Sequence, residues 1–576
     1  MTIQLNRHQI VFILFVMIVL ISCIDWGLPD QYRMELLTSN SHITSEQLKL
    51  ISTDRKQYYN HLNRLRERRV KNLQSGKQID FFSKPKIGKN ERNYSQIEKR
   101  TFLRSYILGG SAPDEREPYS ALSQINLKKF NFELKSIYGG AFVYPIGVLI
   151  FCLKSLGYIE VTKDLSKYVN NPKSIARMYV CGRSLNVLAF LGTIILIALL
   201  GNNFYGFSCG TTGMLIYAFS PYALNHSVIT KPHIYAAFWV VFGLFLLISY
   251  CINKSKLSLI LSSICCGIAS GSIYPSVICL LMYPVLIFDK DNIKQSIKLI
   301  ATPIIISIII VLITNPYFLI KPLAIWVKFL YVGSGNGLGY IFSITKIKNY
   351  LLSFLCVTNC FPFGLLGVMF CFKEIKGDDS VLKRLSLLFL LWLVILSLIL
   401  PNVRVSMFTM PLLCVLTSAG IYKMLSGKKL SKRIVFILFI LFIPGIIFFV
   451  TFSYCTINHN RHNKSMKEWI QTLKPDDSIG VFGSLSPVHI PAFPFLNRSI
   501  INMSTINMVN KKQLPQYIII GNYTSVMPKK WHSLSLKKHY QLIKSCGVFQ
   551  GNYILQKLIN MNLSRKGAFI YMKRPS

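Results

Sequence analysis

The stretch PHIYAAFWVVFGLFLLISYCI, residues 232–252, carries no Asp, Glu, Lys or Arg. An apolar run of about 20 residues is long enough to cross the hydrocarbon core of a bilayer as a helix. A first such run, from Ile10 to Ile24, is not followed by small cleavable residues, so we interpret it as an uncleaved helix. The remaining spanning candidates lie near residues 184–201, 206–222, 257–273, 275–288, 297–315, 350–372, 385–400, 403–422 and 434–453.

The composition of the whole chain also fits a lipid environment. Of its 576 residues, 52% are apolar and 15% are charged, which excludes a cytosolic enzyme, a disordered chain and a disulfide-stapled secreted module. The net charge of +42 therefore points to anionic membrane lipid or phosphate-bearing substrates as partners, rather than to nucleic acid. Ten of the 14 Cys lie inside apolar runs and none forms a CxxC motif, so we interpret them as small core residues.

The distribution of basic residues predicts the topology. The run from Gly139 to Leu156 is apolar enough to span, but it contains Pro145 and Lys154. If this run lies in the interface instead, four short loops with 14 Lys and Arg fall on the side of the N-terminus. The opposite short loops then hold only Lys231 and Arg404. The positive-inside rule therefore favours eleven spans, with residues 139–156 in the interface on the outer side.

We therefore predict an α-helical polytopic protein of the plasma or inner membrane. Its expected parts are a first transmembrane helix (1–24), a long outer loop with juxtamembrane helices (25–183), a transmembrane bundle (184–454) and a small extracytoplasmic α/β domain (455–576). In the last part, KSMKEWIQTLKPDDSIGVFGS predicts a helix, a turn and a buried strand, and QYIIIGNYT predicts another strand. It shows no phosphate-binding glycine loop and no nucleophile elbow, so we expect an accessory role.

Three carboxylates near the outer membrane surface are candidates for chemistry. Asp114 and Glu115 are adjacent in SAPDERE, and Asp25 directly follows the first span. An ionised carboxylate beside lipid is costly and is kept where a cation, a proton transfer or an acceptor hydroxyl uses it. The alternatives are a hydrated turn set by Pro113 for the adjacent pair and an interfacial anchor for Asp25.

Basic residues at the outer ends of the spans are candidates for binding phosphate. They are Arg183 in CGRSLNVL, Lys231 in ITKPHIY and Arg404 in PNVRVSMF. Such side chains either bind a phosphate or extend to a lipid headgroup, and their shared side favours the phosphate. His226 and His233 lie in the same outer loop, but two histidines without a third ligand or a carboxylate at metal spacing are weak evidence for a metal.

The order of these motifs resembles the GT-C fold of integral membrane glycosyltransferases, in particular the family 39-like group with the protein O-mannosyltransferases and lipid A aminoarabinose transferases. PDE at Pro113 to Glu115 is similar to the acidic motif of the family's first outer loop. YGGAFVYP is similar to the juxtamembrane element that follows it, and GRSLNVLAFLG to the Arg that opens the next span. Later landmarks are AFSPYALNHSVITKPHIYAAF, GIASGSIYPS and NVRVSMFTMPLLCVLTSAGIY, so the resemblance covers roughly residues 100–424 and the first span.

The resemblance implies an enzyme that transfers a sugar from a polyprenyl-phosphate donor to a protein, lipid or glycan acceptor on the extracytoplasmic face. It implies that Asp114 takes the acceptor proton, with Glu115 as its neighbour, while basic groups hold the leaving phosphate. The long insertion before PDE keeps Asp25 open as the alternative acid.

The resemblance also implies residues that line the substrate, namely Tyr138, Tyr144 and His233. His233 stands where relatives commonly show Asp, so the sequence allows a divalent cation without requiring one. No other cofactor is expected.

Two other functions stay open at this point. A transporter or flippase of lipid-linked glycans would also be polytopic and basic, but transporters place ionisable residues at the midplane of broken helices. In this chain the ionisable residues gather at the outer ends of the spans, which favours the enzyme. A structural or assembly protein is disfavoured by the PDE segment and its aromatic neighbours. The sequence specifies neither the sugar, the acceptor nor the oligomeric state.

Overall fold

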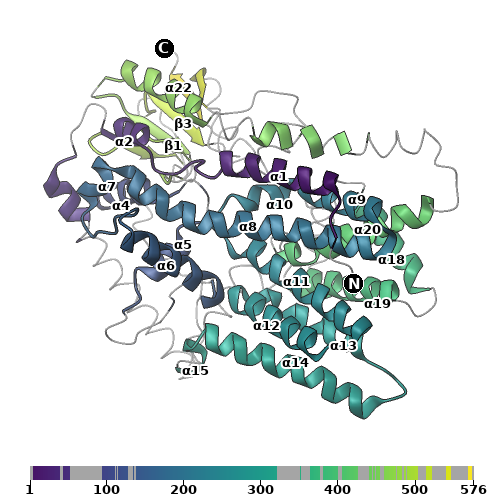
Figure 1. Ribbon diagram of the computed structural model, residues 1–576. Helices are drawn as coiled ribbons and strands as arrows, with labels where there is room; N and C mark the ends of the chain where they lie inside the picture. The colour runs from purple at the N-terminus through teal and green to yellow at the C-terminus, as the bar shows by residue number, and fades with distance from the viewer. Residues whose placement is uncertain are drawn as a thin grey trace. The chain divides into compact units, whose positions relative to one another are not determined.

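The computed structural model contains two compact units (Figure 1), which are described separately. The helical unit comprises Met1–Ile24, Glu117–Leu149 and Cys181–Ser453, and the sheet unit comprises Asp25–Arg116, Ile150–Val180 and Tyr454–Ser576. The structure describes residues 4–38, 43–51, 53, 94–110, 112, 114–126, 134, 138–320, 351, 363–376, 381–399, 405–425, 440, 442–443, 445–447, 449–453, 459–474, 476–482, 485–487, 490–503, 514–521, 540–546 and 568–573.

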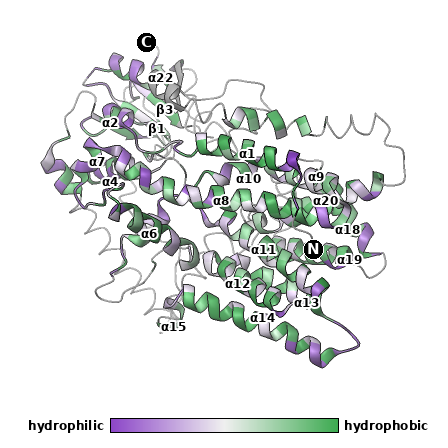
Figure 2. Cartoon of the chain, in the orientation of Figure 1, coloured by the Kyte–Doolittle hydropathy of each residue, from purple (hydrophilic) through white to green (hydrophobic). Residues whose placement is uncertain are grey.

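Four described helices are long and apolar enough to cross a membrane. They are α8 (Pro172–Tyr205), α11 (Pro232–Asn253), α14 (Ile293–Thr314) and α19 (Val381–Ile399). Figure 2 shows them as mostly hydrophobic along their lengths, and α14 buries little of its apolar surface. Such surfaces are stable against lipid, so the chain is a membrane protein, while the count of eleven spans stays a prediction.

The other predicted runs form shorter elements, several of them delimited by proline. The run 206–222 is divided because Pro221 opens a new helix, and the run 275–288 begins with a 3₁₀ segment that contains Pro275. The shorter described elements are α1 (Arg7–Ser22), α5 (Glu117–Leu122), α6 (Gly140–Ser155), α9 (Phe207–Ala218), α10 (Pro221–Ser227), α12 (Lys256–Ser272), η2 (Tyr274–Leu281), α13 (Met282–Ile287), α15 (Tyr317–Ile320), α18 (Phe363–Ile375), η5 (Val405–Phe408) and α20 (Met410–Leu425). Of these, α5 and α15 lie outside the predicted runs. The predicted runs 350–372 and 434–453 fall partly outside the described residues.

The sheet unit contains a mixed five-stranded sheet of order β2-β1-β3-β5-β4. The strands are β1 (Ile479–Phe482), β2 (Ile500–Asn502), β3 (Tyr517–Gly521), β4 (Tyr540–Cys546) and β5 (Ala568–Lys573). β1 pairs in parallel with β2 and β3, whereas β5 pairs antiparallel with β3 and β4. The strands expected in IGVFG and QYIIIGNYT are thus confirmed as β1 and β3.

Helices from distant parts of the chain pack within this sheet unit. They are α2 (Gln31–Thr38), α4 (Gln96–Leu108), α7 (Leu165–Asn170) and α22 (His459–Thr472), the last of which confirms the helix expected at KSMKEWIQTL. Tyr106 of α4 donates its hydroxyl to the Ile490 carbonyl at 2.8 Å, and Lys99 donates to the Arg498 carbonyl at 2.7 Å. Burial lowers the pKa of Lys99. The segment before PDE is therefore anchored on the C-terminal sheet.

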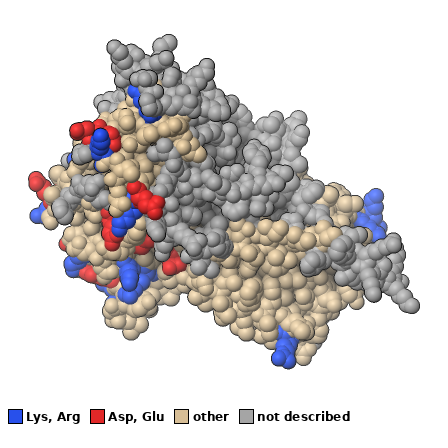
Figure 3. All heavy atoms as spheres, turned by 90° about the horizontal axis from the view of Figure 1, so that it is seen from above, with Lys and Arg blue, Asp and Glu red and all other residues tan. Residues whose placement is uncertain are grey.

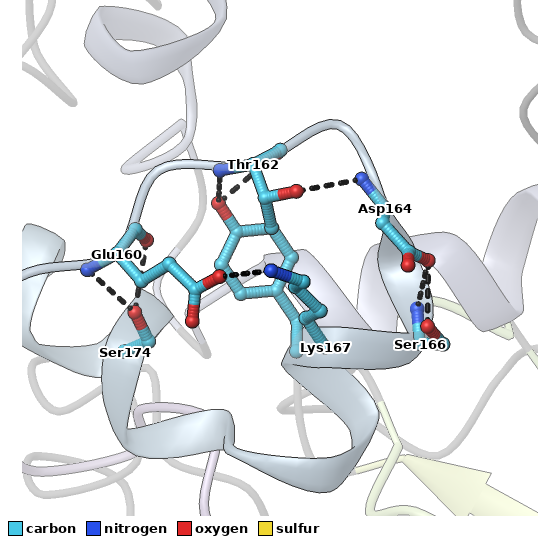
Figure 4. A network of polar contacts seen from close by, with 7 residues as sticks. Glu160, Thr162, Asp164, Ser166, Lys167 and Ser174 are labelled. Carbon is cyan, nitrogen blue, oxygen red and sulfur yellow. Dashed lines mark hydrogen bonds and ion pairs between the residues drawn. The ribbon is translucent and has the colours of Figure 1, made fainter.

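Side-chain hydrogen bonds fix the loop between α6 and α8 (Figure 4). Ser174 Oγ donates to the Glu160 carbonyl at 2.9 Å, and the Glu160 carboxylate pairs with Lys167 at 2.7 Å. The Thr162 N–H donates to Tyr168 Oη at 2.9 Å. On the face drawn in Figure 3, acidic and basic side chains are interspersed over one part of the described surface, while the rest of that surface is nearly free of charged side chains except for basic groups at its edges.

Candidate functional site

The predicted acids Asp114 and Glu115 lie in one turn of the sheet unit with opposite exposures. Asp114 has a φ of 61°, a left-handed conformation that Asp tolerates better than most residues, and it is exposed. Glu115 is fully buried. A Cβ on Gly110 would overlap Glu115 Oε2, so glycine there admits the buried carboxylate. The two adjacent carboxylates therefore differ in environment, because Asp114 is exposed at the surface of its unit and Glu115 is enclosed within it.

The alternative acid Asp25 lies in the turn that follows α1. It is exposed, and its carbonyl accepts the Leu28 N–H at 3.2 Å. Asp30, a few residues on, accepts the Arg33 N–H at 2.7 Å through Oδ1. Asp25 and Asp114 therefore belong to the same unit, and each presents its carboxylate from a turn.

Arg183 and Lys231 lie in the helical unit, and both are buried. Arg183 on α8 is fully buried, and its Nη1 donates to the Ile24 carbonyl at 2.7 Å. Lys231 is 3% exposed and directly precedes α11. Asn186, about one turn along α8 from Arg183, donates its Nδ2 to the Lys231 carbonyl at 2.8 Å. Asn186 thus fixes the Lys231 main chain against the helix that carries Arg183.

A tyrosine and a threonine lie beside the same part of α8. The hydroxyls of Tyr119, in α5, and Thr230 lie 3.0 Å apart. A Cβ on Gly182 would overlap Thr230 and crowd the Tyr119 hydroxyl, so the glycine beside Arg183 permits their close approach to α8. The motif CGRSLN therefore supplies a small residue, a cation and an amide on consecutive turns of one helix.

The burial of Arg183 and Lys231 has an electrostatic consequence. Transferring a cation from water into a protein interior costs several kcal/mol, and an anionic partner offsets that cost. Attraction between opposite charges is also stronger there than in water. A buried arginine or lysine side chain therefore favours an anionic group beside it.

The two histidines also lie in the helical unit, where His226 belongs to α10 and His233 to α11. The ring centroids of His226 and His233 are 6.1 Å apart, and His226 Nδ1 lies 2.9 Å from the Tyr222 carbonyl. Within the described residues, no group of three or more His, Cys, Asp or Glu could hold a metal ion. His233 follows Lys231 by two residues and belongs to the same unit.

The predicted substrate-lining tyrosines flank the start of α6. Tyr138 is buried and its ring meets Phe142 edge to face, with centroids 6.4 Å apart. Phe142 in turn packs on Tyr235, two residues beyond His233, at 5.5 Å. Tyr144 is partly exposed. These aromatic rings belong to the unit that carries Arg183 and Lys231.

One predicted residue lies outside the described residues, and several structural partners were not predicted. Arg404 falls in the undescribed range 401–404. Asn186 and Tyr119 were missed, although an Asn inside the apolar run GRSLNVLAFLG is a signal that could have identified the first. Thr230 gave no signal, because its role depends on a contact with a distant segment.

The comparisons with known proteins give a structural likeness only. No protein-family model and no curated protein matches the sequence. Among solved structures, the chain is similar to ArnT from Cupriavidus metallidurans bound to undecaprenyl phosphate, with 10% identity, 81% of this chain and 95% of that chain covered, and a TM-score of 0.42.

A second group of similar structures comes from Archaeoglobus fulgidus. Its oligosaccharyltransferase in complex with Zn and sulfate is 13% identical, with 70% of this chain and 61% of that chain covered and a TM-score of 0.38. The oligosaccharyltransferase AglB with an inhibitory peptide and a dolichol-phosphate is 11% identical, with 70% and 63% covered and a TM-score of 0.38. Likeness at these identities and TM-scores carries no information on activity or substrate.

Proposed function

We propose that the protein is a GT-C-type membrane glycosyltransferase that transfers a sugar from a polyprenyl-phosphate donor to an acceptor on the extracytoplasmic face. The observation that carries this proposal is the pair of buried cations, Arg183 and Lys231, in a unit built of apolar helices. An apolar environment suits a polyprenyl chain, and the cations suit its phosphate. A phosphate without a lipid chain would make no contact with the surrounding apolar surface.

The carboxylates supply the second half of the chemistry. Asp114 takes a proton from an acceptor hydroxyl or amide, and the acceptor atom forms a bond to the anomeric carbon of the sugar. The bond from that carbon to the phosphate oxygen breaks, and polyprenyl phosphate leaves as an anion that the cations stabilise. Asp25 is the alternative base, because it is also exposed on a turn of the same unit.

The remaining predicted residues keep their proposed roles. Arg404 is a third phosphate-binding group, and Tyr138, Tyr144 and His233 contact the donor or acceptor. We assign neutralisation of the leaving phosphate to these basic side chains, and a divalent cation is the alternative. Activity that persists in EDTA supports this assignment, and loss of activity that only a divalent cation restores contradicts it.

The proposal is tested by incubating purified protein in lipid with a panel of polyprenyl-phosphate sugars and measuring free polyprenyl phosphate by thin-layer chromatography. Wild-type protein is expected to release polyprenyl phosphate from at least one donor, and Asp114→Asn to release it much more slowly. Donors that bind and are moved across the bilayer without release would identify a transporter instead.

A further inference from the structure

The sheet unit contains a buried guanidinium, that of Arg33, which has no place in the roles above. Arg33 is 5% exposed and lies in the first turn of α2, where its N–H is capped by Asp30 Oδ1. It belongs to the long segment between the first span and the PDE motif. Burying a guanidinium is costly unless its donors are satisfied. The groups that accept its hydrogen bonds therefore show which parts of the chain the buried Arg33 side chain holds together.

The partners are main-chain carbonyls from two separate segments. Arg33 Nη2 donates to the Gly27 carbonyl at 2.8 Å. Its Nη1 donates to the Gly109 carbonyl at 2.8 Å and to the Tyr106 carbonyl at 3.4 Å. Because one planar group spans only a few ångströms, the segments at Gly27 and Gly109 lie side by side in the sheet unit.

The location of these carbonyls connects Arg33 with both candidate bases. Gly27 follows Asp25 by two residues, and Gly109 precedes Asp114 by five. Tyr106 is in the last turn of α4, where a cation also interacts favourably with the helix dipole. One side chain therefore ties together the two chain segments that carry the exposed acids.

Other bonds hold the same end of α4 in place. Arg116, two residues after Asp114, donates its Nη1 to Ser105 Oγ at 2.8 Å. The Tyr179 hydroxyl donates to the Leu108 carbonyl at 2.8 Å. The end of α4 is thus a fixed reference point, and Arg33 attaches the Asp25 turn to it.

From this geometry we infer that Arg33 is a positioning residue that sets the Asp25 and Asp114 segments relative to each other. It contacts neither substrate nor the reacting atoms. The role in turnover rests on the proposed function, whereas the connection between the two segments stands on the geometry alone. Arginine is required because two of its donors must reach separate carbonyls in one plane, which a lysine ammonium does not reproduce.

The test compares Arg33→Ala and Arg33→Lys with the wild type and with a matched control, Arg177→Ala. Arg177 lies in the same unit and also donates a guanidinium hydrogen bond to a carbonyl, that of Tyr158 at 2.7 Å. Amide hydrogen exchange is measured for peptides covering residues 25–30 and 105–116, with and without methylguanidinium. Release of polyprenyl phosphate and donor binding are measured on the same samples.

Exchange in Arg33→Ala is expected to rise in both peptides together, and methylguanidinium is expected to reverse part of the rise. Turnover should fall roughly 10- to 100-fold with donor binding unchanged, because small misplacement of a catalytic group is costly. Arg33→Lys should stay impaired, and Arg177→Ala should alter neither peptide.

Three results would overturn the inference. They are a rise confined to one peptide, an equal rise throughout the sheet unit, or no response to methylguanidinium. If wild-type protein releases no polyprenyl phosphate from any donor, the proposed function fails, while the exchange measurement still decides whether Arg33 joins the segments.

Discussion

At the scale of single residues, the adjacent acids of the PDE motif differ in burial and in backbone conformation. Asp114 has a φ of 61° and is exposed, whereas Glu115 is fully buried. Asp and Asn adopt this conformation at lower cost than most residues. Asp114→Asn therefore removes basicity without adding backbone strain.

The first prediction ranks the three carboxylates by turnover. Asp114→Asn should lower turnover by about 10² to 10⁴-fold, the usual contribution of a general base. Glu115→Gln should affect turnover less and thermal stability more, because Glu115 is buried. Near-normal turnover in Asp114→Asn together with an inactive Asp25→Asn would transfer the catalytic role to Asp25.

At the scale of elements, two glycines determine how α6 joins the bundle. A Cβ on Gly139 would overlap the Gly271 carbonyl, and one on Gly140 would overlap the Thr314 carbonyl. The two N–H groups donate to the Ser272 carbonyl at 2.9 Å and to Asn315 Oδ1 at 2.8 Å. The YGGAFVYP motif is therefore glycine-rich because α6 meets the ends of α12 and α14 backbone to backbone.

Gly140→Ala is accordingly expected to destabilise the protein by about 1 to 3 kcal/mol, the usual cost of overpacking. Gly157→Ala serves as the control, because Gly157 has a φ of 72° with no atom near its Cβ position and should show only the backbone cost of about 1 kcal/mol. Thermal unfolding in detergent measures both. Equal stability of Gly140→Ala and wild type would contradict the close packing.

The loop after α6 yields a prediction about the membrane interface. Leu156 and Tyr158 are 79% and 53% exposed although the hydrogen bonds of Figure 4 fix the loop that follows them. Exposed apolar and aromatic side chains at this position suit the headgroup region of a bilayer. Tyr158→Trp should add fluorescence that brominated lipids quench, whereas Asn170→Trp on α7 should not. Equal quenching at both positions would contradict the interfacial placement.

The sequence predicts elements better than it predicts contacts. Long apolar runs locate α8, α11, α14 and α19, and short apolar runs beside turn residues locate β1 and β3, because these signals are local. Arg33 could not be identified in this way, since nothing in RMELLT indicates which distant carbonyls it binds. The left-handed φ of Asp114 was likewise not predicted from the sequence.

At the scale of the whole molecule, the asymmetry of basic loops makes a topology prediction. Single cysteines at positions 429 and 378 should resist an impermeant thiol reagent in intact cells, whereas cysteines at 504 and 72 should react. The background should carry Cys152→Ser, because Cys152 is exposed. Labelling at position 429 from outside would contradict the eleven-span topology.

The proposed mechanism assigns donor binding to buried cations and proton transfer to an exposed acid. Substitution of a cation should therefore weaken donor binding, whereas substitution of the acid should lower turnover and leave donor binding unchanged. The decisive measurement determines the dissociation constant of polyprenyl phosphate and the single-turnover rate on the same preparations of wild type, Arg183→Gln, Lys231→Gln and Asp114→Asn. The cation variants should weaken binding roughly 10- to 150-fold, the cost of a lost charged hydrogen bond of about 1.5 to 3 kcal/mol. Asp114→Asn should bind normally and turn over slowly; unchanged binding in both folded cation variants would contradict the account.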